Sequence, residues 1–593
     1  MTRKKVPHRN SRISRGIFGF VLLIAFAAFA SVSWGMYTLP DSRSVKWKGN
    51  VGVNNDIPCR KKVHRSVPAS GDDDTSAIQD AINGCPAGQV VLLEKGTFKV
   101  SRPITVTSYV TLRGAGMGKT VIQGRRGMTG AYVVGIKNRH QSFGTASAIT
   151  WGLAKGSTSI TTALPHGWRT GDIILIDQLN DAGSDPPVTN KGSNAGKCTW
   201  CGRERGTRSL GQVNRIVATP TSRRAILEIP LYWSFKTTLA PQAVTMNGIV
   251  SRAGIENLTV DNTLSGSDNQ KSDGGTILLK STANCWLFNV EAIGVWETMV
   301  RMHGTYRNTV RSCKLHEGAS PPGSSQYGIF MNPYNSANLV ENNQIYRLTS
   351  GILFNGAVSG NVFSYNYLTE LHSTTTASWN MAAIGTHGSH PMMNLIEGNY
   401  AEGRMRNDDV WGSSSHNTLF RNRIQLPSGK GSGTWNIDLH SHQQYYNIIG
   451  NVLGKPGVEH VGELQNKTLS RQKSNFRFGY NSDGDGSPQD NDPRVHSTLL
   501  RHANWDSVTN DTAWNGNDDR RLPASLYLSR KPSWWGRMRW PCIGPDIRPM
   551  FPAAQGTGKG TPWEARKKSQ ARRECSEISP LNRLSNDSRY QAP

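Results

Sequence analysis

Five acidic and imidazole side chains in the second half of the chain are candidates for acid–base chemistry: His387, Asp408, Asp409, Asp438 and His440. An imidazole can take or give a proton near neutral pH, and a carboxyl group can act as an acid or hold a cation. Asp438 and His440 are two residues apart, so on a β-strand they share one face. The core-facing positions of that strand then fall to Ile437 and Leu439.

The remaining candidates are brought together by a repeated asparagine. Counted back from the asparagines that open each repeat, His387 and His440 fall on one position. Asp408 and Asp438 fall on another, two residues earlier. We therefore expect these four side chains to form a surface patch over three coils. A register error of one residue would put Asp409 in place of Asp408.

Two reactions suit such a patch. Elimination from a uronic acid needs a base for the C5 proton, which His387 or His440 could supply, and a cation that neutralises the sugar carboxylate. Hydrolysis needs two carboxyl groups, one of them protonated, and Asp408 and Asp438 could form that pair. A third interpretation is structural, in which these residues only stack and hydrogen-bond on the outer face.

Further side chains around the patch are candidates for substrate binding: His390, Arg404, Arg406, Trp411, His416 and His442. The two arginines precede the acidic pair and could bind an anionic sugar. A possible calcium loop lies further on, at Asp483, Asp485, Asp490 and Asp492. Its oxygen ligands alternate around a glycine, but the bidentate Glu of an EF-hand is replaced by Asp, so a solvated acidic turn is the alternative.

The element that must position these residues is a repeat. A phrase of apolar residues bounded by asparagines begins at Asn284, Asn308, Asn338, Asn361, Asn394, Asn417 and Asn447. Successive copies begin 23 to 33 residues apart, a period typical of solenoids. The Val, Ile, Leu, Phe and Tyr content of the phrases indicates strands, so we predict an all-β parallel β-helix. Asparagines at one position of every coil can then bond to one another in a ladder.

The rest of the chain is divided around this repeat. We expect a basic signal peptide or signal anchor at 1–40 and a linker at 41–67. The β-helix follows at 68–480, with a short helix near 72–82 and an inserted β-rich lobe at about 140–245. A capping region at 481–552 is expected to fold over the last coil, and a basic tail at 553–593 is expected to be disordered.

The opening of the predicted β-helix resembles a known family. Asp72 to Gln79, Gly96 to Phe98 and Val110 to Gly116 resemble the start of the pectate-lyase-like superfamily, in particular its rhamnogalacturonase and epimerase-like branch. The resemblance implies a right-handed parallel β-helix that is capped by a short N-terminal helix. That superfamily includes lyases, hydrolases, epimerases and non-catalytic proteins.

The catalytic motifs of two members are incomplete in this chain. Polygalacturonases resembling this fold carry Asp-Asp, then Gly-His-Gly, then Arg-Ile-Lys. Here Asp408-Asp409 is present, but His387-Gly388 precedes it, and Arg423-Ile424-Gln425 departs at its third residue. The Arg-x-x-Pro-x-x-Arg phrase of pectate lyases is missing.

The net charge and the cysteine content limit which partners and which compartment the protein can have. The 593 residues carry a net charge of +26, which favours an acidic partner, and no nucleic-acid motif is present. Eight cysteines suit an oxidising compartment. Cys59 and Cys85 could be linked, and Cys198 and Cys201 could form a loop disulfide or remain thiols. Gly114 to Thr120 is similar to a phosphate-binding loop, but Arg113 occupies the position of the first glycine that such a loop requires, so nucleotide binding is disfavoured.

These observations lead to one functional prediction. We expect an exported protein, secreted, periplasmic or at the cell surface, that modifies an acidic polysaccharide by β-elimination, with calcium as an optional cofactor. A glycoside hydrolase that uses the Asp pair and a non-catalytic glycan-binding protein remain the alternatives.

Overall fold

The computed structural model describes residues 36–138, 142–192, 196–265, 274–295, 297–318, 325–373, 377–427, 429–464, 472–481, 492–515, 520–537 and 539–550. The expected leader at 1–40 therefore lies almost wholly outside the described residues, as does the expected tail at 553–593. Within the described residues, no helix is long and apolar enough to cross a membrane.

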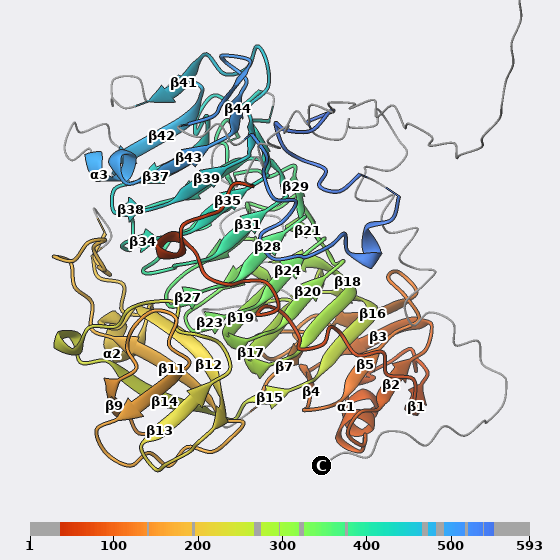
Figure 1. Ribbon diagram of the computed structural model, residues 1–593. Helices are drawn as coiled ribbons and strands as arrows, with labels where there is room; N and C mark the ends of the chain where they lie inside the picture. Colours follow the sequence, from red (N-terminus) through yellow and green to blue (C-terminus); the bar gives the residue numbers. More distant parts are fainter. Residues whose placement is uncertain are drawn as a thin grey trace, which may run out of the picture. The chain divides into compact units, whose positions relative to one another are not determined.

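Stacked short strands form a parallel β-helix, as predicted (Figure 1). One coil runs through β24 (Leu339–Glu341), β25 (Gln344–Tyr346) and β26 (Ser350–Phe354). The next runs through β28 (Val362–Ser364), β29 (Tyr367–Thr369) and β30 (Ala382–Thr386). Each strand pairs in parallel with its counterpart one coil on. The first two strands of each coil belong to a 22-stranded sheet and the third to a 14-stranded sheet, as counted over the described residues.

Apolar residues fill the space inside the coils. Ile329, Ile352, Ile384, Met405 and Ile437 occupy the same position of five successive coils and are buried in one core. At the N-terminal end, helix α1 (Thr75–Asn83) buries one apolar face against this core. The helix covers backbone groups that an open first coil would expose.

Two ladders of asparagines run along the β-helix, one just before and one just after the first strand of each coil, and they stabilise the turns there. Each amide in the series Asn338, Asn361, Asn394 and Asn417 bonds to the next at 2.8–2.9 Å. A second series runs through Asn343, Asn366, Asn399, Asn422, Asn451 and Asn504 at 2.9–3.0 Å. The ladder predicted from the repeat is therefore present, and it is double.

The last repeat is offset by one residue from the predicted alignment. Asn447 pairs with Thr418, whereas Tyr446 takes the ladder position and accepts a hydrogen bond from Asn417 Nδ2 at 3.1 Å. A tyrosine hydroxyl thus replaces the amide oxygen, which a pattern of asparagines does not detect.

The insertion is an antiparallel lobe whose strands form one seven-stranded sheet in the described part of the chain. Its strands are β8 (Ser142–Phe143), β9 (Ser147–Trp151), β10 (Ser159–Thr162), β11 (Ile173–Gln178), β12 (Leu210–Ala218), β13 (Arg224–Leu227) and β14 (Gln242–Asn247). It packs beside the coils, where the Ser336 hydroxyl accepts a hydrogen bond from Val213 N. Figure 1 shows the lobe in orange and yellow.

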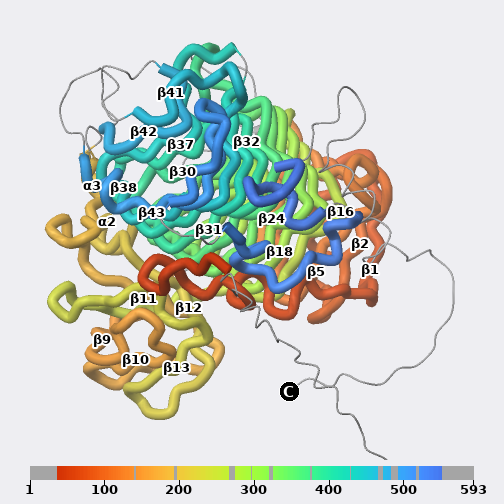
Figure 2. The backbone as a smooth tube through the Cα atoms, turned by 45° about the horizontal axis from the view of Figure 1, so that its top comes forward, coloured from red at the N-terminus to blue at the C-terminus, as the bar shows by residue number. Residues whose placement is uncertain are grey.

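Residues 41–67 are not a linker. Strand β1 (Val63–Val67) pairs with β2 (Val90–Leu93) as part of the first coils. Residues 36–57, which we call the N-terminal strap, lie across the outside of later coils (Figure 2). Trp47 is buried there, and its indole N–H donates to the Met393 carbonyl. The prediction was wrong because the stretch shows no strand periodicity, although it contains aromatic and apolar residues that are buried in the structure.

The expected C-terminal cap is also placed differently. Residues 520–537 and 539–550, which we call the C-terminal strap, pack along the flank of central coils, where the Tyr527 hydroxyl donates to Glu341 and Arg421 pairs with Asp546. The end of the β-helix instead gains another strand pair, β43 (Leu500–His502) and β44 (Asn504–Asp506), and β45 (Asp511–Ala513) closes it antiparallel to β44.

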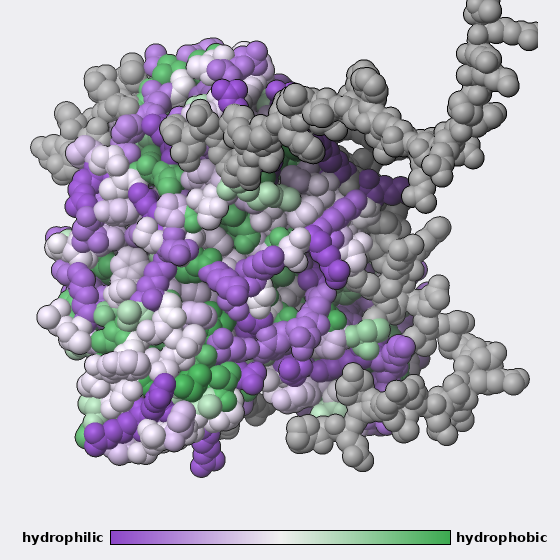
Figure 3. Space-filling view, in the orientation of Figure 1, coloured by the Kyte–Doolittle hydropathy of each residue, from purple (hydrophilic) through white to green (hydrophobic). Residues whose placement is uncertain are grey.

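The cysteines divide between thiols and disulfides. Cys198 and Cys201 form a buried disulfide in the lobe. Cys85 is a free thiol, so the suggested Cys59–Cys85 link is not made. Hydrophilic residues predominate on the face shown in Figure 3, with small hydrophobic patches between them.

Candidate functional site

The predicted acid–base residues gather on the outer side of the 14-stranded sheet. Strand β33 (Arg404–Asn407) follows β30, and β37 (Trp435–His440) and β42 (Ser474–Tyr480) follow in turn. In register, Gly385 faces Arg406, Arg406 faces Asp438, and Asp438 faces Arg477. The side chains of this row point away from the core because Met405 and Ile437 point into it.

His387 and Asp408 form a hydrogen-bonded pair. His387 Nδ1 lies 2.8 and 3.0 Å from the two Asp408 carboxylate oxygens. A carboxylate can only accept, so Nδ1 carries the proton, and a neutral ring has its lone pair on Nε2. The imidazole remains 33% exposed, whereas the carboxylate is 2% exposed. The side-chain oxygen of Asn355 also accepts from His387 N at 2.7 Å, which fixes the turn that carries the ring.

Arg406 completes this group. Its guanidinium lies 3.0 Å from Asp408 Oδ2, and 26% of its side chain is exposed. Burial alone would raise the pKa of Asp408, but the charges of Arg406 and His387 outweigh burial and hold that pKa well below the usual range. We call His387, Asp408 and Arg406 the exposed triad. It presents to solvent one oriented imidazole and one cation.

Asp438 and His440 belong to a second, buried network. The Asp438 carboxylate accepts two bonds from Arg477, at 2.7 and 3.0 Å, and a third from Arg404 at 3.0 Å. His440 lies between Asp438 and Asp409, at 3.2 and 3.4 Å. Burial opposes ionisation of Asp438, but Arg477, His440 and Arg404 hold its pKa well below the usual range. None of these residues is more than 10% exposed along its side chain.

The structure corrects the predicted register. Asp438 lies opposite Arg406, not opposite Asp408, and His387 bonds to Asp408, not to a stacked His440. The expectation that Asp438 and His440 lie at the surface is wrong, because both are buried. The distance from this sheet to the next ladder position differs between coils, being nine residues from Asp408 to Asn417 and six from His440 to Tyr446, so counting back from the ladder gives the wrong register.

Several residues predicted to bind substrate lie elsewhere or are inaccessible. His390 is fully buried between the Ser413 and Ser415 hydroxyls, and burial lowers its pKa to about 3. His416 stacks on Tyr445 inside the molecule, and burial likewise lowers its pKa to about 3.

Arg404 and His442, two further predicted binding residues, have structural partners. Arg404 is 2% exposed and is occupied by Asp438. His442 lies beside helix α3 (Pro493–Ser497), where its backbone N–H bonds Asp492.

Trp411 does lie near the triad. Its ring meets Trp200 of the lobe edge-on, with centroids 6.4 Å apart. Trp200, Asn355 and Arg477 were not predicted. Arg477 follows a segment in which the asparagine phrase has faded, and Trp200 is far away in sequence, so no spacing could link either to the site. The one signal in the sequence was a glycine in each of these turns, Gly388 and Gly412, where the lobe comes close through side chains at Gly388 and through the Thr189 backbone at Gly412.

The calcium candidate falls mostly outside the described residues, which exclude Asp483, Asp485 and Asp490. Asp492 is described, and its carboxylate caps helix α3 by accepting from Arg494 N. Among the described residues, no group of three or more His, Cys, Asp or Glu side chains is arranged to hold a metal ion.

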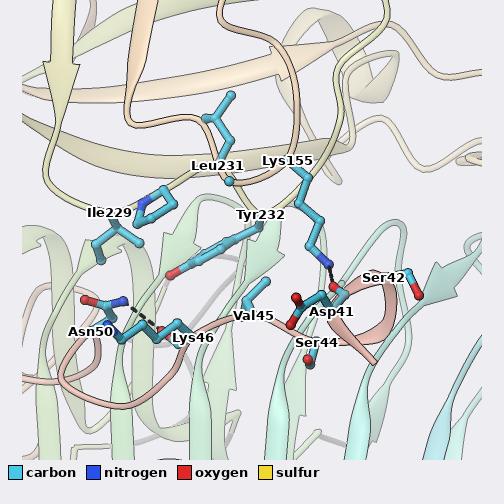
Figure 4. A pocket seen from close by; sticks show the side chains of 12 residues that line it. Asp41, Ser42, Ser44, Val45, Lys46, Asn50, Lys155, Ile229, Leu231 and Tyr232 are labelled. Carbon is cyan, nitrogen blue, oxygen red and sulfur yellow. Dashed lines mark hydrogen bonds between the residues drawn. The ribbon is translucent and has the colours of Figure 1, made fainter. Parts of the chain in front are cut away.

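A separate pocket of about 660 Å³ lies between the N-terminal strap and the lobe (Figure 4). Lys155 reaches across it from the lobe and donates to the Asp41 carbonyl, and Tyr232 lies along its wall. Burial lowers the pKa of Lys155 to about 8. The pocket contains none of the predicted site residues, and its lysine ties the strap to the lobe.

Comparisons with known proteins agree with this fold. Residues 66–170 match the family model described as "Rhamnogalacturonase A/epimerase, pectate lyase-like". The coils described above confirm the predicted parallel β-helix, and this match shows that its first part is similar to that family. No curated protein matches the chain in sequence.

Solved structures are similar to this chain only at low identity and with TM-scores below 0.5. The tailspike gp49 of Pseudomonas phage LKA1 is 14% identical, with a TM-score of 0.47 over 69% of this chain and 63% of that one. The tailspike gp61 of Pseudomonas phage phi297 is 14% identical, with a TM-score of 0.45 over 69% and 66%. PfbA, a surface adhesin of Streptococcus pneumoniae, is 13% identical, with a TM-score of 0.38 over 70% and 87%. The chain thus spans less than two thirds of the length of either tailspike.

Proposed function

We propose that this protein is an exported enzyme that cleaves an acidic, uronate-containing polysaccharide by β-elimination. The observation that carries the proposal is the exposed triad, in which Asp408 orients the His387 ring and Arg406 lies beside it. A base and a cation on the same surface are what proton abstraction next to a carboxylate requires. The positive net charge of +26 suits an acidic polymer.

The chemistry follows from the roles of these three residues. His387 Nε2 takes the C5 proton, the electron pair forms the C4=C5 double bond, and the C4–O bond breaks. The leaving oxygen takes a proton from solvent or from the His387 imidazolium. Arg406 neutralises the sugar carboxylate and stabilises the charge that builds on it when C5 is deprotonated. Asp408 stays ionised and holds the ring as its charge changes.

The alternative of hydrolysis is less compatible with this geometry. A glycosidase acid must hold a proton at working pH and reach the glycosidic oxygen. Asp408 and Asp438 are 2% and 0% exposed, and the pKa of each is held well below the usual range by its cationic partners. Neither carboxyl therefore suits the role of general acid.

A polymer screen tests the proposal. The full chain is incubated with polygalacturonate, alginate and hyaluronan, with and without calcium. Ultraviolet absorbance of the unsaturated product and new reducing ends are followed together. We expect both signals to rise together on one of these polymers. Reducing ends without absorbance would indicate a hydrolase, and binding without either signal would indicate a glycan-binding protein.

A further inference from the structure

The inserted lobe docks on the turns that carry the exposed triad. Three successive coils have a glycine at the contact: Gly356, Gly388 and Gly412. A Cβ on Gly356 would lie 2.5 Å from the Cys201 carbonyl oxygen, and one on Gly412 would lie 2.1 Å from that of Thr189. Real Cβ atoms do not come so close, so the glycines permit direct contact between the lobe and these turns.

Hydrogen bonds fix the lobe at this contact. The hydroxyls of Ser209 and Ser389 are 2.8 Å apart. Thr189 N donates to the Ser413 hydroxyl at 3.0 Å, and Ser413 N donates back to the Thr189 carbonyl at 3.0 Å. The turn after His387 and the turn after Asp409 are therefore both held by lobe residues.

The disulfide loop of the lobe places an aromatic ring beside His387. The Trp200 ring lies 2.9 Å from where a Gly388 Cβ would be, next to His387 in the chain. Cys198 and Cys201 are fully buried on either side, yet Trp200 remains 39% exposed. Trp411, from the turn after Asp409, meets it at an interplanar angle of 67°. Two aromatic rings from distant parts of the chain thus form a corner beside the triad.

We propose that Trp200 and Trp411 form a sugar-stacking subsite for the unit next to the reacting uronate, so that the lobe completes the substrate site. This inference rests on the proposed function for the neighbouring uronate but names a separate binding element. A pyranose presents an apolar face of C–H groups, and aromatic rings are the side chains that pack on such a face. Stacking on a sugar would explain why the Trp200 ring stays exposed, although the disulfide loop that carries it is rigidly held.

Binding measurements on the full chain test this subsite. Trp200→Ala and Trp411→Ala are compared with Trp151→Ala, a control on lobe strand β9 whose ring is 62% exposed. All three are made in the His387→Ala background, so turnover does not consume the ligand. The probes are hexasaccharides of polygalacturonate and alginate, titrated by calorimetry. Trp200→Phe, which keeps a ring in the loop, controls for misfolding.

We expect Trp200→Ala and Trp411→Ala each to weaken binding about tenfold or more, and Trp200→Phe and Trp151→Ala to stay within about twofold. Unchanged binding by Trp200→Ala, or equal weakening by Trp151→Ala, would overturn the subsite. It would also be overturned if neither hexasaccharide bound the parent. Failure of the proposed chemistry would look different: His387→Ala would still form product while the tryptophan variants lost affinity.

Discussion

At the scale of single residues, the proposed chemistry depends on Asp408 as the partner of one imidazole. The carboxylate accepts from His387 Nδ1 and from Val410 N, and it pairs with Arg406. Only 2% of its side chain is exposed to solvent. Asp408 is therefore a positioning residue, and His387 is the group that meets substrate.

Replacement of Asp408 by Asn tests that division of roles. The amide keeps the size of the side chain but loses the charge that stabilises an imidazolium. We expect kcat to fall about 100-fold or more with KM changed only slightly. Initial rates of absorbance increase measure both constants. Asp511→Asn, at the exposed start of β45, is the matched control, and equal rates in both variants would remove Asp408 from the mechanism.

Asp438 is predicted to matter for stability instead. Replacing it by Asn leaves Arg404 and Arg477 buried without their counter-charge, which costs about 3–5 kcal/mol in comparable cases. We expect a lowered Tm at pH 7 by calorimetry. The folded pKa of Asp438 is depressed, so its contribution is complete above the unfolded value of about 3.9 and is lost as pH falls below it.

The pH dependence gives a second readout for Asp438. Between about pH 4 and pH 2, wild type should lose ion-pair stability that the Asp438→Asn variant never had. The difference in unfolding free energy between the two proteins should therefore shrink toward low pH. A difference that stays constant over that range would contradict the ion-pair account.

At the scale of elements, the sequence predicted the repeating parts and missed the parts that do not repeat. The ladder asparagines and the apolar positions around Ile352 recur from coil to coil with few exceptions, so their periodicity predicts parallel strands. The register of Asp438 and His440 could not be predicted, because the number of residues between this sheet and the next ladder position differs from coil to coil. The straps and the contact of Trp200 with Trp411 join residues hundreds of positions apart, and no local pattern encodes such contacts.

The ladders can be tested at Asn361. Its Oδ1 accepts from Asn338, and its amide donates to Asn394. Asn361→Ala removes both ladder hydrogen bonds and the acceptor of the buried Asn338 backbone N–H, which should destabilise the protein by about 1–3 kcal/mol in denaturant unfolding. Asn83→Ala, exposed at the end of α1, should change stability by less than about 0.5 kcal/mol. Similar effects in the two variants would mean that the ladder adds nothing to stability.

At the scale of the whole molecule, the two straps protect the outer face of the 22-stranded sheet. Glu397 lies under the C-terminal strap, where it accepts from Leu526 N at 2.8 Å and from the Tyr365 hydroxyl at 3.0 Å. Burial raises the pKa of Glu397 to about 7. Docking of the strap is thereby coupled to a proton on this carboxyl group.

This coupling predicts a loss of stability at alkaline pH. A raised folded pKa contributes stability that is complete below the unfolded value, near 4.3, and is lost as pH rises through about 7. Wild type should lose up to about 3 kcal/mol between pH 5 and pH 9, whereas Glu397→Gln should be nearly independent of pH at this site. Parallel pH profiles of Tm for the two proteins would contradict the prediction.

The most direct test of the proposed function is the rate of unsaturated product formed by His387→Ala on the polymer that wild type cleaves fastest. The account predicts a fall of about 100-fold or more, with polymer binding retained. His64→Ala, an exposed histidine of β1, should match wild type. A His387→Ala rate within about threefold of wild type would show that another residue takes the C5 proton and would contradict the assignment of the exposed triad.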